Sequence, residues 1–311
     1  MMPAARGPRF GLVIARAGSH IHFRRDRHRV SAAGLDLLIE RTSAQLGQIS
    51  GVADAGIKPG VVASRVAAEL LARGEPSLSQ LLDSAEGGDA TAKTELRNLL
   101  TVNYSCFWRE PEHWPILAEH LCLRIQSGAP LRMWSAACAR GEEAWTMALV
   151  ATEVAARFPQ LAPHWDWRVL GTDIDTRSLE AAATARYTQE ELGPLPLRMR
   201  SHLLPSGSAT APRWDIPAAL HERVHFRHLD LAQAQWQPPA EAPFDAIFLS
   251  NVLIYLDRVT QERILRNVAA CLRPDGILFT SRIEGNLGLA TTHLKAAGSC
   301  TYITARTARR P

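Results

Sequence analysis

The sequence predicts an α/β fold: a mostly parallel sheet with helices on both faces, preceded by a small helical domain. From residue 131 onward, strand-like and helix-like segments alternate along the chain, which is typical of a parallel sheet. The apolar run 131–135 ends in small residues and leads into a helix that starts at Glu142. Residues 59–73 instead carry apolar side chains at helical spacing. In such sheets, ligands bind at the carboxyl ends of the strands.

Length and composition are those of a folded globular protein with two unequal domains. The chain has 311 residues, of which 46% are hydrophobic and 21% charged. The net charge is +4, and residues 1–45 hold eight arginines against three acidic residues. This segment is either a solvated extension or a patch for an acidic partner. We divide the chain into a basic extension (1–45), a helical domain (46–100), a linker (101–113) and a larger domain (114–311) with an insert at about 193–222.

Several classes of site are not expected. Five cysteines without a Cys-x-x-Cys pair indicate neither a disulfide framework nor a zinc site. His20, His22 and His28 have no carboxylate or Cys at ligand spacing, so no metal site is predicted. The apolar run 10–15 is too short for a signal peptide or a membrane span, which favours a cytoplasmic protein without membrane insertion.

From about residue 31 the chain is predicted to be helical up to an unusual linker. We expect a helix starting near Ser31, then helices over 59–73 and 77–84 and a further helix from about residue 90 to 100. Residues 101–111 mix hydroxyl, amide, aromatic and guanidinium groups, a set suited to a polar ligand. An interdomain connector whose aromatic side chains fill a gap is the alternative.

The larger domain contains the alternating segments. The expected strands are 131–135, 167–171, 224–227, 244–249 and 277–281, with a terminal strand over 299–304 at an edge of the sheet. The expected helices are 114–126, 142–157, 175–186 and 260–272. Four polar residues follow strand ends and should meet at one edge of the sheet: Ser135, Asp173, Asp230 and Asn251.

The first strand-to-helix loop indicates the type of cofactor. It holds one glycine, Gly141, whereas a dinucleotide loop needs several to approach a pyrophosphate. Asp173 is placed to accept both hydroxyls of a ribose, and the adjacent acids Glu142 and Glu143 could bind an ammonium group. Each carboxylate alone is equally consistent with a role at a helix terminus or turn. Together they favour S-adenosylmethionine.

Four motifs in order then identify a family. They are residues 101–110 (TVNYSCFWRE), 134–143 (WSAACARGEE), 171–175 (GTDID) and 244–255 (FDAIFLSNVLIY). With them, the sequence from about residue 55 to the end resembles the CheR-type chemoreceptor glutamate methyltransferases of bacterial chemotaxis. The resemblance implies a class I S-adenosylmethionine-dependent methyltransferase domain behind a small helical domain, with S-adenosylhomocysteine as a product.

The resemblance also implies roles for individual residues. The residues at cofactor-contacting positions of the family motifs are Asn103, Ser105, Arg109, Ala136, Glu142, Asp173, Asp230, Leu231, Asn251 and Val252. Arg109 would also orient the carboxylate to be methylated, and Tyr255 would lie beside the methyl group, although a core aromatic is as consistent with that position. Arg65 and Arg73 match the helix that faces the acidic helical region of a receptor.

The sequence departs from the family pattern in several places. Ser105 replaces a usual Thr, Asp230 a usual Asn, and residues 281–285 (SRIEG) replace Gly-His-Ser-Glu. The insert 193–222 has no clear hairpin, which speaks against the binding of a receptor tail peptide. The first 45 residues have no recognised counterpart.

Three functions remain open. The chain methylates a receptor-like protein, or a small molecule or non-receptor protein, or it only binds the cofactor. Retention of the whole motif set disfavours the third. A nucleic-acid substrate is not expected, because no Asn/Asp-Pro-Pro-aromatic run is present and the basic excess lies far from the cofactor motifs.

Overall fold

The computed structural model describes residues 15–17, 20–22, 29–50, 59–99, 105–233, 237–284 and 292–304. The chain forms two compact units, which divide between Leu100 and Thr101 apart from residues 50–52. We describe each unit by itself. In the described part of the chain, every helix is too short or too polar to cross a membrane. Within those ranges, His, Cys, Asp and Glu also form no group of three that could hold a metal ion.

The first unit is a helical bundle with a small sheet. Its elements are β1 (Ala15–Ala17), β2 (His20–His22), β3 (Arg29–Ser31), α1 (Ala32–Ser50), α2 (Pro59–Arg73), α3 (Glu75–Glu86) and α4 (Ala90–Leu99). The Ser31 hydroxyl accepts a hydrogen bond from Gly34 N, close to the expected helix start. Leu38 and Leu46 of α1 share one core with the apolar faces of the other helices. This helical core therefore includes residues that the sequence assigned to the basic extension.

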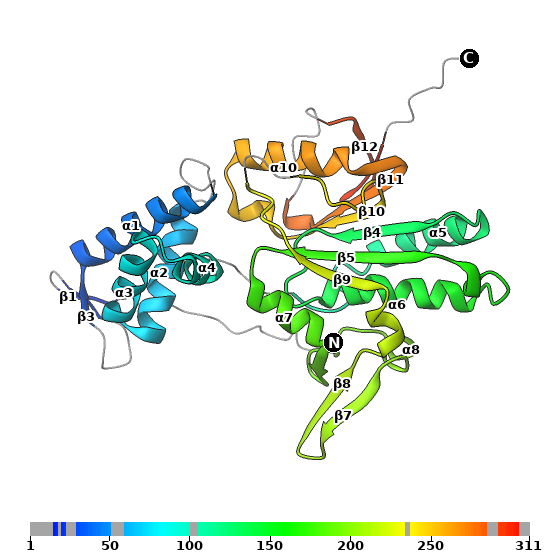
Figure 1. The fold of residues 1–311 in the computed structure, drawn as a ribbon, viewed down its shortest axis with the longest axis horizontal. Helices are drawn as coiled ribbons and strands as arrows, with labels where there is room; N and C mark the ends of the chain where they lie inside the picture. Colours follow the sequence, from blue (N-terminus) through cyan, green and yellow to red (C-terminus); the bar gives the residue numbers. More distant parts are fainter. Residues whose placement is uncertain are drawn as a thin grey trace, which may run out of the picture. The chain divides into compact units, whose positions relative to one another are not determined.

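The second unit is built on a seven-stranded sheet (Figure 1). Along the sheet the strands are β12 (Leu294–Gly298), β13 (Thr301–Thr304), β11 (Leu272–Thr280), β10 (Phe244–Leu249), β4 (Leu131–Ser135), β5 (Trp167–Asp173) and β9 (Val224–His228). The pairs from β11 to β9 are parallel, and β13 runs antiparallel to both of its neighbours.

Helices cover both faces of this sheet. The layer on one face contains α5 (His113–Gln126), α6 (Glu142–Ala156) and α7 (Thr176–Thr184), and α10 (Arg258–Ala270) lies on the other (Figure 1). Between α5 and the sheet, Trp114 stacks on Phe248 with ring centroids 5.0 Å apart. Short 3-10 turns follow β10 and β11, namely η3 (Leu253–Tyr255) and η4 (Arg282–Glu284), and η2 (Ala162–His164) precedes β5. The fold class expected from the sequence is confirmed.

The terminal strand was misplaced. We predicted residues 299–304 as an edge strand, but β13 lies between β11 and β12. The edge is β12, whose sequence Leu-Lys-Ala-Ala-Gly lacks the β-branched and aromatic residues typical of strands. Its pairing with β13 is therefore a tertiary effect that composition did not reveal.

The insert contains the hairpin that the sequence did not predict. After β6 (Arg186–Thr188) and α8 (Leu197–Arg200), β7 (Leu204–Ser208) pairs with β8 (Ala211–Asp215), and α9 (Ala218–His221) follows. The hairpin was missed because β7 and β8 are mostly exposed and each contains a proline. Gly207 supplies the left-handed backbone of the turn, with φ 80°. The argument against binding of a receptor tail peptide rested on the lack of a hairpin in this insert, so it no longer applies.

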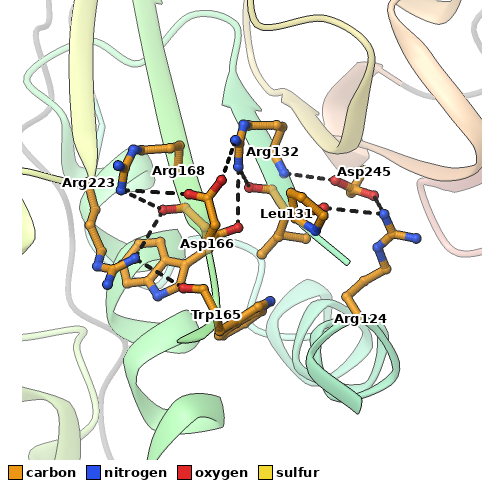
Figure 2. A network of polar contacts seen from close by, with 10 residues as sticks. Arg124, Leu131, Arg132, Trp165, Asp166, Arg168, Arg223 and Asp245 are labelled. Atoms are coloured by element: carbon orange, nitrogen blue, oxygen red, sulfur yellow. Dashed lines mark hydrogen bonds and ion pairs between the residues drawn. The ribbon is translucent and has the colours of Figure 1, made fainter. Parts of the chain in front are cut away.

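The amino ends of the strands are fastened by ion pairs (Figure 2). The buried Asp245 carboxylate accepts from Arg132 N at 2.8 Å and pairs with the Arg124 guanidinium at 2.6 Å. Arg132 also pairs with Asp166 at 2.6 Å, and Arg223 lies over the Trp167 ring, 4.9 Å from its centroid. These contacts join β4, β5 and β10 to α5 at this end of the sheet.

Candidate active site

The loop between β4 and α6 lies against the neighbouring strands at the carboxyl edge of the sheet. Ala136 N donates to Phe248 O at 2.8 Å, and Cys138 N donates to Thr172 O at 2.9 Å. Gly141 has φ 88°, and a Cβ there would lie 2.8 Å from Ala182 Cβ. Glycine is required at this position for both reasons. The loop thus leads from the end of β4 into the first turn of α6 at the carboxyl edge of the sheet.

Among the buried side-chain oxygens at this edge that lack a hydrogen-bond partner in the described part of the chain, two belong to predicted cofactor residues. They are Oε2 of Glu142, at the start of α6, and Oδ1 of Asn251, in the loop after β10. Asn251 adopts a left-handed backbone with φ 62°. Burial raises the pKa of Glu142. Unpaired buried acceptors are costly, so they fit a ligand that donates hydrogen bonds, as the amino group and adenine of S-adenosylmethionine do.

Asp173 connects the end of β5 to the cofactor loop. Its Oδ2 accepts from Ala139 N at 2.8 Å and its Oδ1 from Asp175 N at 2.9 Å. The N-cap of α7 is Asp175, which accepts from Arg177 N. Asp173 is therefore a turn residue but not the helix cap. Its carboxylate is 8% exposed, burial raises its pKa, and it retains lone pairs for a ligand.

The other predicted cofactor residues occupy the same edge. Asp230 and Leu231 follow β9 and are buried, and Asp230 Oδ1 accepts from Ala232 N at 2.9 Å. Val252 follows Asn251 and is half-buried. Because β10, β4, β5 and β9 are adjacent and parallel, their carboxyl ends bring these residues together.

The aromatic and the polar residues of the linker have different surroundings. Phe107 and Trp108 pack into the core, and Trp108 stacks on Trp114 at 5.6 Å. The gap-filling interpretation therefore holds for these aromatics. Ser105 hydrogen-bonds the Glu142 side chain, and Arg109 O accepts from Trp114 Nε1 at 2.9 Å. Asn103 lies outside the described residues.

Glu143 is a buried acid whose hydrogen-bond partners the sequence did not predict. Its Oε1 accepts from Ser135 Oγ at 2.6 Å, and Ser250 also hydrogen-bonds it. Burial raises the pKa of Glu143 to about 7, although these hydrogen bonds and the charge of Arg109 lower it. Of the two adjacent glutamates that the sequence offered for an ammonium group, only Glu142 was matched to a cofactor position of the family.

Replacing Glu143 with glutamine should change how stability depends on pH. The pKa of this carboxyl rises from 4.5 to about 7 on folding, so the wild type loses stability as pH increases through this interval. Glutamine does not titrate. When the pH is raised from about 5 to about 8, the free energy of unfolding of Glu143→Gln should therefore increase relative to that of the wild type, by up to about 3 kcal/mol.

Urea denaturation at both pH values, without cofactor, measures this shift. Glu180→Gln, at an exposed position of α7, is the matched control. A difference between Glu143→Gln and wild type that does not change with pH would contradict the prediction.

The remaining predicted residues are Tyr255, Arg65 and Arg73. Tyr255 ends η3 and is half-buried. Arg65 and Arg73 belong to α2 of the first unit, where Arg73 pairs with Glu69 and Glu95. The roles of all three remain predictions.

Comparison with known proteins agrees with this geometry. Residues 103–296 match the family model described as CheR methyltransferase, SAM binding domain. The chain is 34% identical to the chemotaxis protein methyltransferase of Salmonella typhimurium, over 80% of this chain and 84% of that protein. It is 35% identical to chemotaxis protein methyltransferase 2 of Pseudomonas aeruginosa, over 66% of this chain and 71% of that protein. The chain therefore belongs to the CheR methyltransferase family and is an S-adenosylmethionine-dependent methyltransferase of the chemotaxis type.

Proposed function

We propose that this enzyme methylates glutamate side chains of a chemoreceptor or a related coiled-coil signalling protein. The observation that carries the proposal is the pair of unpartnered buried oxygens on Glu142 and Asn251, at the same sheet edge as Asp173. These groups suit a cationic nucleoside ligand. Arg109, whose charge acts on buried Glu143, supplies a guanidinium for an acceptor carboxylate.

Different residues at this edge of the sheet bind different parts of the cofactor. Asp173 binds the ribose hydroxyls, and Glu142 binds the amino group with help from Ser105. Ala136, Asp230, Leu231, Asn251 and Val252 form the remaining contacts, together with Asn103 and Arg109 from the linker. When bound, S-adenosylmethionine supplies a methyl group activated by the neighbouring sulfonium.

The chain's own residues position the acceptor and keep water out. A glutamate side chain with a pKa near 4.3 is already ionised at neutral pH, so no general base is required. Arg109 orients the carboxylate through parallel N–H bonds, which leaves one oxygen in line with the methyl group. Tyr255 hydrogen-bonds the other oxygen. The apolar core below the edge excludes water and so favours a reaction in which opposite charges neutralise each other.

The receptor would approach through an acidic helical region. Arg65 and Arg73 of α2 are the basic residues that we assign to this contact, and a cytoplasmic location follows from such a substrate. Arg73 already pairs with two glutamates of its own unit, so receptor binding would exchange these pairs for new ones.

Transfer of labelled methyl in an extract of the source cell tests the proposal. The purified enzyme and labelled S-adenosylmethionine are added, and the labelled products are separated and treated with mild alkali. Label on a coiled-coil receptor that alkali releases as methanol is the expected result, because carboxyl methyl esters hydrolyse under these conditions. Alkali-stable label, or label only in small molecules, would contradict the glutamate ester. Cofactor binding without any transfer would contradict catalysis.

A further inference from the structure

The turn η4 is fastened to the loop that follows β10. Glu284 Oε1 accepts from Val252 N at 2.9 Å and from Leu253 N at 3.0 Å. Its Oε2 accepts from both the backbone N and the hydroxyl of Ser281, each at 2.9 Å. Four hydrogen bonds therefore fix this buried carboxylate, and with it the position of η4 relative to Asn251.

The same turn reaches the linker on its other side. The Arg282 guanidinium donates from Nε to Glu112 Oε1 at 2.6 Å, and its second contact to that oxygen is 2.5 Å long. Its Nε also lies 3.4 Å from Glu110 Oε2. Glu110 and Glu112 follow Arg109 by one and three residues. Arg282 thus joins the segment of Arg109 to the segment of Asn251 and Tyr255.

The backbone around Arg109 is one that needs external support. Trp108 and Glu110 both adopt left-handed conformations, with φ 57° and 48°. Non-glycine residues persist in this region only where their surroundings hold them. Trp114 Nε1 fixes the carbonyl of Arg109, and His113 N donates to the carbonyl of Glu110. The ion pairs of Arg282 hold Glu110 and Glu112 from outside the linker.

We propose that Arg282 is a positioning residue that holds Arg109 in register with the loop after β10. The inference rests on the proposed role of Arg109 and deepens it. Residues 281–285 depart from the sequence usual in the family, so the contacts of Arg282 are a feature of the present chain. The clamp predicts that the affinity for cofactor depends on two charges that do not touch the cofactor, those of exposed Arg282 and half-buried Glu112.

A double-mutant cycle tests the clamp. The variants are Arg282→Ala, Glu112→Gln and the pair together, and the readout is the dissociation constant of S-adenosylhomocysteine by calorimetry. Each single variant should weaken binding about three- to fivefold, the scale of a small network of exposed ion pairs. The double variant should be no weaker than either single variant, because the two residues act through one contact. Arg282→Lys should recover part of the loss.

Arg258→Ala is the matched control, because Arg258 is also exposed and pairs with a glutamate, Glu262, four residues later in the same helix, α10. It should bind S-adenosylhomocysteine as the wild type does. Arg258 and Arg282 are both exposed, so their replacement by alanine should leave the fold intact, which melting temperatures verify. Turnover adds a second readout, since loss of positioning should raise KM for the cofactor and lower kcat while Arg258→Ala changes neither.

Two outcomes would overturn the clamp: wild-type affinity in Arg282→Ala, or strictly additive effects in the double variant. Failure of the proposed function would look different. Binding to S-adenosylhomocysteine needs no methyl acceptor, so the cycle is informative even if the acceptor is not a glutamate. A normal Arg109→Ala enzyme would instead remove the role on which the clamp depends.

Discussion

Replacing Arg109 with alanine should lower kcat at least about a hundredfold while the protein stays folded. The guanidinium is the group that we assign to the acceptor carboxylate, and loss of orientation of a reacting group has an effect of this size. The fold should survive because the carbonyl of residue 109 keeps its hydrogen bond from Trp114 Nε1 when the side chain is truncated. Steady-state turnover and thermal melting of the same preparation measure both parts.

Arg109→Lys separates the charge of Arg109 from its geometry. Lysine keeps the positive charge beside Glu143 but cannot form two parallel hydrogen bonds to one carboxylate. Its kcat should therefore stay well below that of the wild type, although above that of Arg109→Ala. Near-normal turnover in a folded Arg109→Ala enzyme would refute the assigned role.

Asp173→Asn should weaken binding of S-adenosylmethionine about a hundredfold. Two hydrogen bonds from ribose hydroxyls to a charged acceptor contribute about 3 kcal/mol, which corresponds to that factor. Asparagine keeps the shape of the side chain and one acceptor oxygen, which can still serve Ala139 N or Asp175 N. The loss should therefore appear in the dissociation constant more than in stability.

The neighbouring Asp175→Asn is the matched control for this experiment. Asp175 caps α7, and asparagine is an equally good cap, so both stability and cofactor affinity should stay close to those of the wild type. Equal affinity in Asp173→Asn and Asp175→Asn would contradict the role of Asp173.

The parts of the site that were predictable from the sequence have local causes. A strand that ends in small residues before a helix, and an acid at the end of the next strand, can be recognised within a few positions. Gly141 and the start of α6 at Glu142 are examples, because turn geometry and helix initiation depend on adjacent residues. The parallel order of the sheet followed from alternation of strands and helices.

The parts that were missed depend on contacts between distant residues. Glu284 accepts from Val252 N and Leu253 N, more than thirty positions away, and nothing near it in the sequence indicates this. Likewise β12 is a strand only because β13 offers it a partner. The raised pKa of Glu143 comes from burial between strand ends that the sequence does not bring together. Such features need the tertiary structure.

The measurement that tests the central claim most directly is localisation of the methyl group on its acceptor. The purified enzyme is incubated with S-adenosylmethionine and the cytoplasmic helical fragment of a receptor from the same cell, and the fragment is mapped by peptide mass spectrometry. A methyl ester on glutamate side chains, lost when the modified glutamates are replaced by alanine, is the result that this account predicts. Methylation confined to another residue type, with an enzyme that is active and binds cofactor, would contradict it.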